Sequence, residues 1–270
     1  MSYALPDGSF LHTRDGSGNN QMSTEQAFYG LVAAQRAAQG RNSLYQMDDA
    51  PIRGDRPAAP ETPAGDGLAG KDPNVAAMPV TNPGRTFADI QNHANRPSIE
   101  ALAARGIIGG MTDTTFAPND TMTRAQFAAI ITRGLGLPSQ TGSVFTDVAQ
   151  TAWFAEPIAT AYHFGLVSGT TPTTFNPNGT ITRQEAAVMV ARAAALAGMD
   201  TARTDIEIIN TLAPFGDYRT AATWAHSALA FVYSEGILDD TEFYIQPTQA
   251  ITRAEIAEML YRLLTQANLM

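Results

Sequence analysis

The 270-residue sequence contains no cysteine, so disulfide bonds play no part in its fold. It also lacks an excess of basic residues, because 26 acidic side chains outnumber 17 Lys and Arg and the net charge is −9. That balance argues against nucleic acid and anionic lipid as general partners. No stretch approaches the roughly 18 apolar residues of a membrane span. We therefore expect neither nucleic-acid binding nor membrane insertion.

Motifs for catalysis and metal binding are also missing. The four histidines are scattered without metal-ligand spacing. The sequence has no Gly-x-Ser-x-Gly, no phosphate-binding loop and no paired-carboxylate motif. It therefore predicts no metal site, no cofactor and no catalytic residue in this chain.

What is present is a short stretch that occurs three times, as Thr123–Gln126, Thr182–Glu185 and Thr252–Glu255. Each copy fits the capping box, in which the Thr side chain and the final Glu or Gln cap a helix start reciprocally. Each copy also opens an apolar run at helical spacing, which predicts one buried stripe of an amphipathic helix. The stripes are Phe127, Ile130, Ile131 and Leu135; Ala186, Met189, Val190 and Ala193; and Ile256, Met259, Leu260, Leu263 and Leu264.

The second residue of each box is Arg124, Arg183 or Arg253. An Arg is unexpected at the first helical position, because the helix macrodipole is positive there. Three of them suggest that an anion completes the site, bound by the guanidinium and by the free N–H groups of the helix start. The alternative is structural: each Arg forms a salt bridge with a neighbour or bonds a loop carbonyl.

Other signals recur around each box. An aromatic-x-Asp start precedes a short apolar helix, which ends at Gly106, Gly165 or Gly236 as a left-handed cap. The Arg residues of successive copies are 59 and 70 residues apart (183 − 124 and 253 − 183). An internal repeat of this size implies units that cannot bury their apolar faces alone.

In this order, the repeated residues resemble three tandem S-layer homology (SLH) domains over about residues 85–265. The resemblance implies an all-α fold, a pseudo-threefold trimer of helix-loop-helix repeats with the box helices as a central three-helix bundle. We place the repeats at residues 85–140, 141–199 and 200–270. The resemblance also implies grooves between repeats that bind secondary cell-wall polysaccharide, often through a pyruvylated sugar. Such binding would anchor a secreted protein non-covalently to a Gram-positive-type cell wall.

On this resemblance, the predicted ligand-binding residues fall into four sets. For the aspartates, sugar contact and loop capping both remain open. For the tryptophans, a position in the core is the favoured alternative to sugar stacking. The sets are the box arginines Arg124, Arg183 and Arg253; Asp89, Asp147 and Asp217 of the aromatic-x-Asp starts; Gly110 and Gly169; and Trp153 and Trp224.

The three repeats also depart from the family pattern in places. Repeat 1 has Ala94 in place of Trp and ends its box in the uncharged Gln126. Repeat 3 has Ile245 in place of Phe, and Asp240 where repeats 1 and 2 have Gly. We expect the groove served by Asp240 to be the weakest for an anionic ligand, because like charges repel.

Upstream of the repeats the sequence changes character. Residues 1–48 resemble the last repeat of an α/α-toroid related to prenyltransferases and squalene cyclases, and we interpret them as the remnant of a larger domain. Residues 49–84 are rich in Pro, Gly and Ala, which predicts a disordered linker that packs little against the repeats. No signal peptide is evident, and since a wall protein must be exported, we expect the native start to lie upstream of Met1. Two alternatives to wall anchoring are a helical protein–protein or surface-layer self-assembly module, and the C-terminal fragment of an enzyme whose activity lies upstream.

Overall fold

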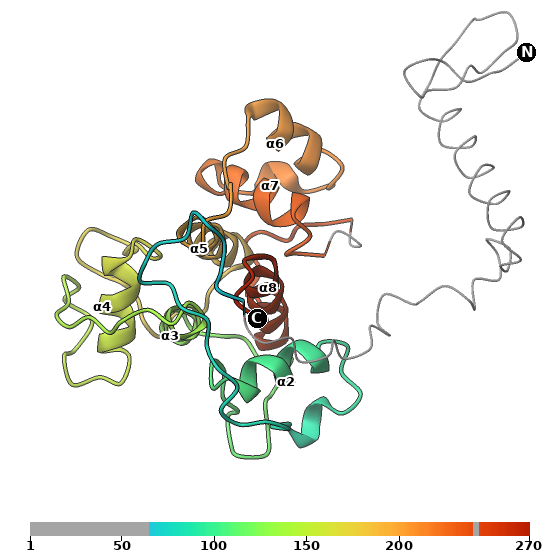
Figure 1. Cartoon of the computed structure of the whole chain (residues 1–270). Helices are drawn as coiled ribbons and strands as arrows, with labels where there is room; N and C mark the ends of the chain where they lie inside the picture. The colour runs from blue at the N-terminus through green and yellow to red at the C-terminus, as the bar shows by residue number, and fades with distance from the viewer. Residues whose placement is uncertain (1–64, 240–242) are drawn as a thin grey trace, which may run out of the picture. The chain divides into compact units, whose positions relative to one another are not determined.

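The computed structural model describes residues 65–239 and 243–270. The described part is all-α, as predicted, and the residues expected to form a toroid remnant (1–48) lie outside it. Its α-helices are α2 (Arg96–Ala104), α3 (Arg124–Gly134), α4 (Ala155–His163), α5 (Arg183–Leu196), α6 (Asp205–Leu212), α7 (His226–Ser234) and α8 (Arg253–Gln266) (Figure 1). Short 3-10 helices η1 (Ala88–Ile90), η2 (Tyr218–Thr220) and η3 (Thr223–Ala225) precede the outer helices of repeats 1 and 3.

The three predicted capping boxes begin α3, α5 and α8. In α3, the Gln126 N–H donates to Thr123 Oγ1 at 3.2 Å, and the Thr123 N–H donates back to Gln126 Oε1 at 2.9 Å. The boxes of α3 and α8 thus each satisfy two backbone groups that a helix start leaves without an intrahelical partner.

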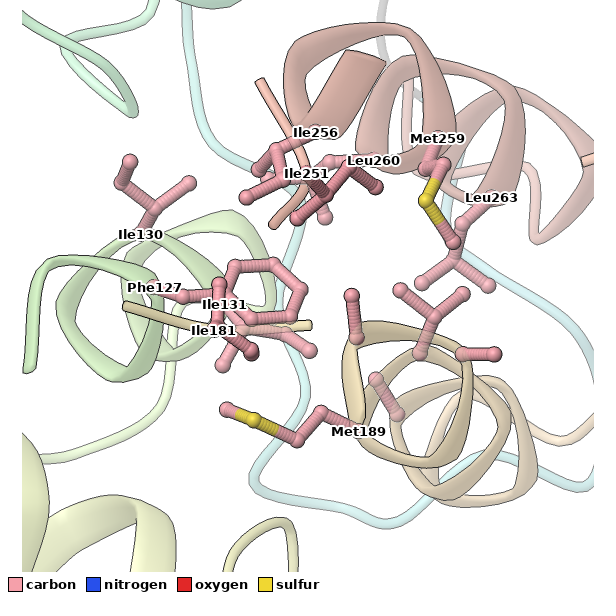
Figure 2. Close-up of a cluster of buried hydrophobic side chains, with 14 of the residues drawn as sticks. Phe127, Ile130, Ile131, Ile181, Met189, Ile251, Ile256, Met259, Leu260 and Leu263 are labelled. Atoms are coloured by element: carbon pink, nitrogen blue, oxygen red, sulfur yellow. The ribbon is translucent and has the colours of Figure 1, made fainter. Parts of the chain in front are cut away.

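The apolar stripes of α3, α5 and α8 face one another at the centre of the repeats (Figure 2). Phe127, Ile131, Val190 and Leu260 are each 0% exposed. Because burying one such side chain contributes about 1.5–3 kcal/mol, this shared core is the main stabilising feature of the repeats. The box helices thus contribute to one shared core within the described residues.

The outer helices join each repeat to the one before it. Helix α4 packs on α3, α7 packs on α5, and α2 packs on α8. The first outer helix therefore closes against the last central helix, and in Figure 1 the outer helices surround the central three. No repeat completes its core alone, as the internal repeat in the sequence predicts.

The N-terminal ends of the central helices are also joined. Isolated β-bridges link Thr123 with Thr180, Thr182 with Ala250, and Thr252 with Thr121. Each bridge connects the box of one repeat to the residue two positions before the box of the next, and the third bridge returns to repeat 1. We call this set of three bridges the bridge ring.

Residues 65–84 contact the opposite ends of the same helices, and we call them the strap. The Gly67 N–H donates to Asn268 O at 3.0 Å, Asp72 N–H to Leu196 O at 2.8 Å, and Ala76 N–H to Leu135 O at 2.9 Å. These carbonyls belong to the ends of α8, α5 and α3, which lack intrahelical donors. The strap has no helix or strand, as predicted, but Val75 within it is 1% exposed. The expectation that residues 49–84 pack little is therefore wrong for residues 65–84, and residues 49–64 lie outside the described part.

Candidate functional site

The box arginines reach from one repeat into the next. Arg124 of repeat 1 donates from Nε to Phe175 O at 2.9 Å and from Nη2 to Ser168 O at 3.1 Å. Its Nη1 lies 2.8 Å from Glu185 Oε1, which closes the box of repeat 2. The guanidinium carbon also lies 4.8 Å from the centre of the Phe175 ring, a cation–π distance. Arg124 is only 7% exposed and thus holds a loop of repeat 2 against the helix start of repeat 1.

Arg253 repeats this arrangement between repeats 3 and 1. Its Nε donates to Phe116 O at 2.8 Å and its Nη2 to Gly109 O at 2.9 Å, and its guanidinium carbon lies 4.6 Å from the centre of the Phe116 ring. Burial lowers the pKa of Arg253, and the nearby charges of Asp120 and Asp89 oppose that shift. Like Arg124, Arg253 is buried.

Arg183 differs from the other two box arginines. It pairs with Glu255, but Ile245 occupies the position of the stacked Phe, and among the described residues Arg183 has no cation–π contact like those of Arg124 and Arg253. Its Nε is buried and has no hydrogen-bond partner among the described residues. In all three repeats the Arg makes the structural contacts that the sequence left open as the alternative.

The amide groups at the starts of the central helices are not free. In α3 the Arg124 N–H donates to Gly179 O at 2.9 Å, and the Ala125 N–H to Pro177 O at 3.0 Å. The equivalent amides of α5 and α8 donate in the same way to residues of repeats 3 and 1. The expectation that an anion uses these N–H groups is therefore wrong. An anion at this site would be held by side chains.

The three predicted aspartates each clamp a loop of their own repeat. Asp147 accepts from the Phe175 N–H at 2.8 Å and from the Asn176 N–H at 2.7 Å, one bond to each carboxylate oxygen. Asn176 has a φ of 58°, so the clamp holds a residue in the left-handed region that non-glycine residues rarely adopt. Asp89 and Asp217 bond the equivalent amides at 2.7–2.8 Å.

The clamp also affects titration. Burial acts to raise the pKa of Asp147, but the bonds from the Phe175 and Asn176 amides and the charge of Arg124 leave that pKa below its ordinary value. The pKa of Asp89 is lowered by the same balance. Both carboxylates remain exposed, so each is a negatively charged acceptor at the surface of its repeat.

The two glycines occupy positions with no room for a side chain. A Cβ at Gly110 would lie 2.3 Å from Thr112 O and 2.6 Å from Phe87 Cε1. A Cβ at Gly169 would lie 2.3 Å from Thr171 O. Glycine is needed here by the protein's own loop, whatever else approaches it. Asp240, the residue at the same place in repeat 3, lies outside the described residues.

The two tryptophans lie just before or at the start of the outer helices of repeats 2 and 3 and face solvent. Trp153 is 61% exposed and Trp224 is 58% exposed, so the favoured interpretation of a core position is wrong. Large aromatic faces of this kind can stack on an apolar ligand face and still offer an N–H donor. Repeat 1 has Ala94 at this place.

Sequence reasoning missed part of the arrangement. The sequence predicts only a capping role for Glu185 and Glu255, yet their second oxygens bind Arg124 and Arg183 of the preceding repeat. The exposed aromatic pair Phe243 and Tyr244 in repeat 3 was also missed. The sequence held a signal for both. The acidic residue recurs at one place in two boxes and is Gln126 in the third, and Phe243 and Tyr244 replace the threonines of the other two repeats.

Other kinds of site find no support in the part of the chain that the structure describes. Within residues 65–239 and 243–270, no group of three or more His, Cys, Asp or Glu side chains could hold a metal ion. No helix of these ranges is long and apolar enough to cross a membrane.

A sequence model of the S-layer homology domain matches residues 86–128, 144–187 and 214–257. Each match runs from the aromatic-x-Asp start into the box helix. Each match lies within one of the repeats predicted from the sequence, whose limits extend beyond the matches by 1 to 14 residues.

Similar proteins share this part of the chain. An amylopullulanase of Thermoanaerobacterium thermosulfurigenes is 36% identical over 68% of the chain, and the exoglucanase XynX of Acetivibrio thermocellus is 34% identical over 74%. A surface-layer 125 kDa protein of Lysinibacillus sphaericus is 30% identical over 69%. The matched segments make up 10%, 18% and 16% of those relatives, so the chain spans a small part of their length.

Proposed function

We propose that the three S-layer homology domains of this chain bind cell-wall polysaccharide and that they recognise a pyruvylated sugar in it. These domains are a non-catalytic anchoring module of the cell surface. This binding holds a larger extracellular protein non-covalently on a Gram-positive-type wall. The ligand contacts we propose are made between repeats by the box arginines, the three clamp aspartates, Gly110, Gly169 and the two exposed tryptophans.

One observation carries the proposal. The same segment occurs in proteins named as an amylopullulanase, an exoglucanase and a surface-layer protein, and it forms a small part of each. Proteins that differ in their named activity share this part, so we infer that it supplies attachment rather than catalysis.

The exposed tryptophans provide the test. We expect the full chain to sediment with purified cell wall and to lose binding when the secondary polysaccharide is stripped. Removing only the pyruvyl groups should weaken binding if the sugar acid is recognised. The double variant Trp153→Ala, Trp224→Ala should bind roughly tenfold more weakly, since stacking contacts contribute about 0.5–1.5 kcal/mol each.

Ile206→Ala is the matched control, because Ile206 is 71% exposed on α6 and is not among the proposed contacts. Equal binding to native and stripped wall would overturn the proposal. Circular dichroism of each variant shows whether the helices are intact.

A second function has one observation in its favour. Helix α6 lies in a stretch at the start of repeat 3 that the other repeats lack, and it exposes Ile206 and Ile209. An apolar helix face of this kind favours self-assembly in a surface layer. Sedimentation velocity over a concentration series separates the two functions: association that Ile206→Asp abolishes would support self-assembly.

A further inference from the structure

A turn just before each box holds the helix start of the preceding repeat through two backbone carbonyls. In repeat 2 the Pro177 carbonyl accepts from the Ala125 N–H at 3.0 Å, and the Gly179 carbonyl accepts from the Arg124 N–H at 2.9 Å. The residue between these two acceptors is Asn178. The length of the backbone through Asn178 therefore sets the spacing of the two carbonyls that bind the start of α3.

Both sides of this turn are fixed. Before it, Asp147 clamps the Phe175 and Asn176 amides with its two carboxylate oxygens. After it, Thr180 forms its β-bridge with Thr123 in the bridge ring. A longer backbone within the turn would therefore displace at least one of the contacts that join repeats 1 and 2.

The residue pair at the tip of the turn is chemically labile. Asn178 is exposed, and no hydrogen bond of its side chain is recorded to any residue that the structure describes. The next residue is Gly179, where a Cβ would lie 2.3 Å from Asn176 Nδ2, so the fold requires glycine here. Because glycine has no side chain, its backbone nitrogen is open to approach from the Asn178 side chain.

We propose that Asn178 is a site of spontaneous deamidation, and that the rearranged product loosens the interface of repeats 1 and 2. The Gly179 nitrogen attacks Cγ of Asn178, a C–N bond forms, and the side-chain nitrogen leaves as ammonia with the proton of the attacking amide. Water then opens the resulting cyclic imide. Opening at the side-chain carbonyl gives Asp, whereas opening at the main-chain carbonyl gives isoaspartate, whose backbone is longer by one carbon.

The folded turn controls the rate of this reaction. The Gly179 N–H donates to Asn176 O at 3.1 Å, so this bond must open before the nitrogen can attack. Asn178 and Thr180 are both exposed, and the opening of a surface turn costs far less free energy than global unfolding. The attacking amide must also lose its proton, so the reaction becomes faster as the pH rises.

Repeats 1 and 3 build the same turn without this pair. In repeat 1 Asn119 precedes Asp120, whose carbonyl accepts from the Arg253 N–H at 2.9 Å. The Asp120 side chain hinders attack by its own backbone nitrogen, and its charge disfavours loss of the amide proton. In repeat 3 the residues are Thr248 and Gln249, and Thr248 has no side-chain amide to lose. Of these three equivalent turns, the one in repeat 2 is therefore the most reactive.

Peptide mass spectrometry of the full chain after incubation at mildly alkaline pH tests the site. The peptide that contains Asn178 should gain the mass difference between an amide and a carboxylic acid several times faster than the peptide that contains Asn119. Digestion at acidic pH prevents further imide formation during analysis. An isoaspartate-specific methyltransferase should label the Asn178 peptide of the aged chain and leave that of the fresh chain unlabelled.

Thermal unfolding tests the structural consequence. The chain modified at Asn178, separated by anion exchange through its added negative charge, should melt roughly 4–8 °C below the fresh chain, because two backbone bonds between repeats 1 and 2 are lost. Asn178→Thr is the matched variant, since repeat 3 has Thr248 at this place. Its mass at this peptide and its melting temperature should not change on incubation.

Asn178→Asp separates the two effects of deamidation, because it adds the charge without lengthening the backbone. Freshly purified, it should melt with the fresh parent chain. Equal rates at Asn178 and Asn119, or no reaction at Asn178, would overturn the assignment of the site. A modified chain that melts with the fresh chain would overturn the loosening of the interface. None of these measurements involves a glycan, so the proposed function stands or falls separately.

Discussion

The two ends of the central helices α3, α5 and α8 are held by different means. At their N-terminal ends the repeats hold one another, through the bridge ring, the box arginines and the amide bonds to the next repeat. At their C-terminal ends the strap, one continuous segment from outside the repeats, bonds to a residue at the end of each helix in turn. Figure 1 shows this segment running across the central helices.

This difference shows which helix ends a repeated sequence can hold in place and which need a separate segment. A contact between neighbouring repeats is encoded once and occurs three times, so the N-terminal ends can be closed by the repeat itself. Helix C-termini leave carbonyls that need donors, and these helices end at different points. A single segment with its own sequence can satisfy each end separately.

The largest expected effect comes from removing the strap. A chain that begins at residue 85 should be less stable than one that begins at residue 65 by about 2–5 kcal/mol in its free energy of unfolding. It loses the backbone bonds and the buried Val75, while the entropy of the freed segment offsets part of that loss. Urea unfolding followed by circular dichroism measures the difference, and coincident unfolding curves would show that the strap is dispensable.

A smaller effect is expected from the N-terminal end. Asp147→Asn should lower the free energy of unfolding by about 1.5–3 kcal/mol, because the amide cannot accept from both the Phe175 and Asn176 N–H groups with full charge. Asp200→Asn is the control, since Asp200 accepts one backbone amide in an exposed loop. If both variants unfold at the same urea concentration, the clamp is not a stabilising feature.

The smallest effect is a difference in acid sensitivity between the two ends. The pKa values of Asp89 and Asp147 are lowered in the folded chain, so their contribution is complete above the unfolded value of about 3.9 and is lost as the pH falls through the lower folded value. The strap bonds are between backbone groups and do not titrate. Hydrogen exchange as the pH falls below about 4 should speed up first at the Phe175 and Asn176 amides, relative to model peptides at the same pH. Equal changes at the Asp72 and Ala76 amides would contradict this prediction.

The extent to which sequence predicted the structure follows the same division. The boxes, stripes and terminal glycines could be predicted because each signal is local and occurs three times. The role of Arg124 could not be decided, because its carbonyl partner Phe175 lies 51 residues away and a carbonyl leaves no mark on residue type. The strap has the sequence of a linker because its contacts use backbone groups and one apolar side chain, Val75, in a Pro- and Gly-rich stretch.

The prediction of a core position for the tryptophans is wrong for a related reason. Large aromatic residues are usually buried, and a single sequence does not show whether a helix start faces the core or solvent. In the structure it is the aromatic residue of each aromatic-x-Asp start that is buried. In repeat 2 this residue is Phe145, whose ring centre lies 5.4 Å from that of Phe175. The tryptophans are left at the surface.

The strap also determines how a pulling force would enter the repeats. A pull on the chain upstream of residue 65 would be met first at Asn268 of repeat 3, then at Leu196 of repeat 2, then at Leu135 of repeat 1. The bonds lie one after another along the strap, so tension would peel them singly, from repeat 3 toward repeat 1. The interfaces with the box arginines lie at the other end of helices of up to 14 residues, about 21 Å away. The strap, which receives the tension, is thus separated from the interfaces between repeats that we propose bind the wall.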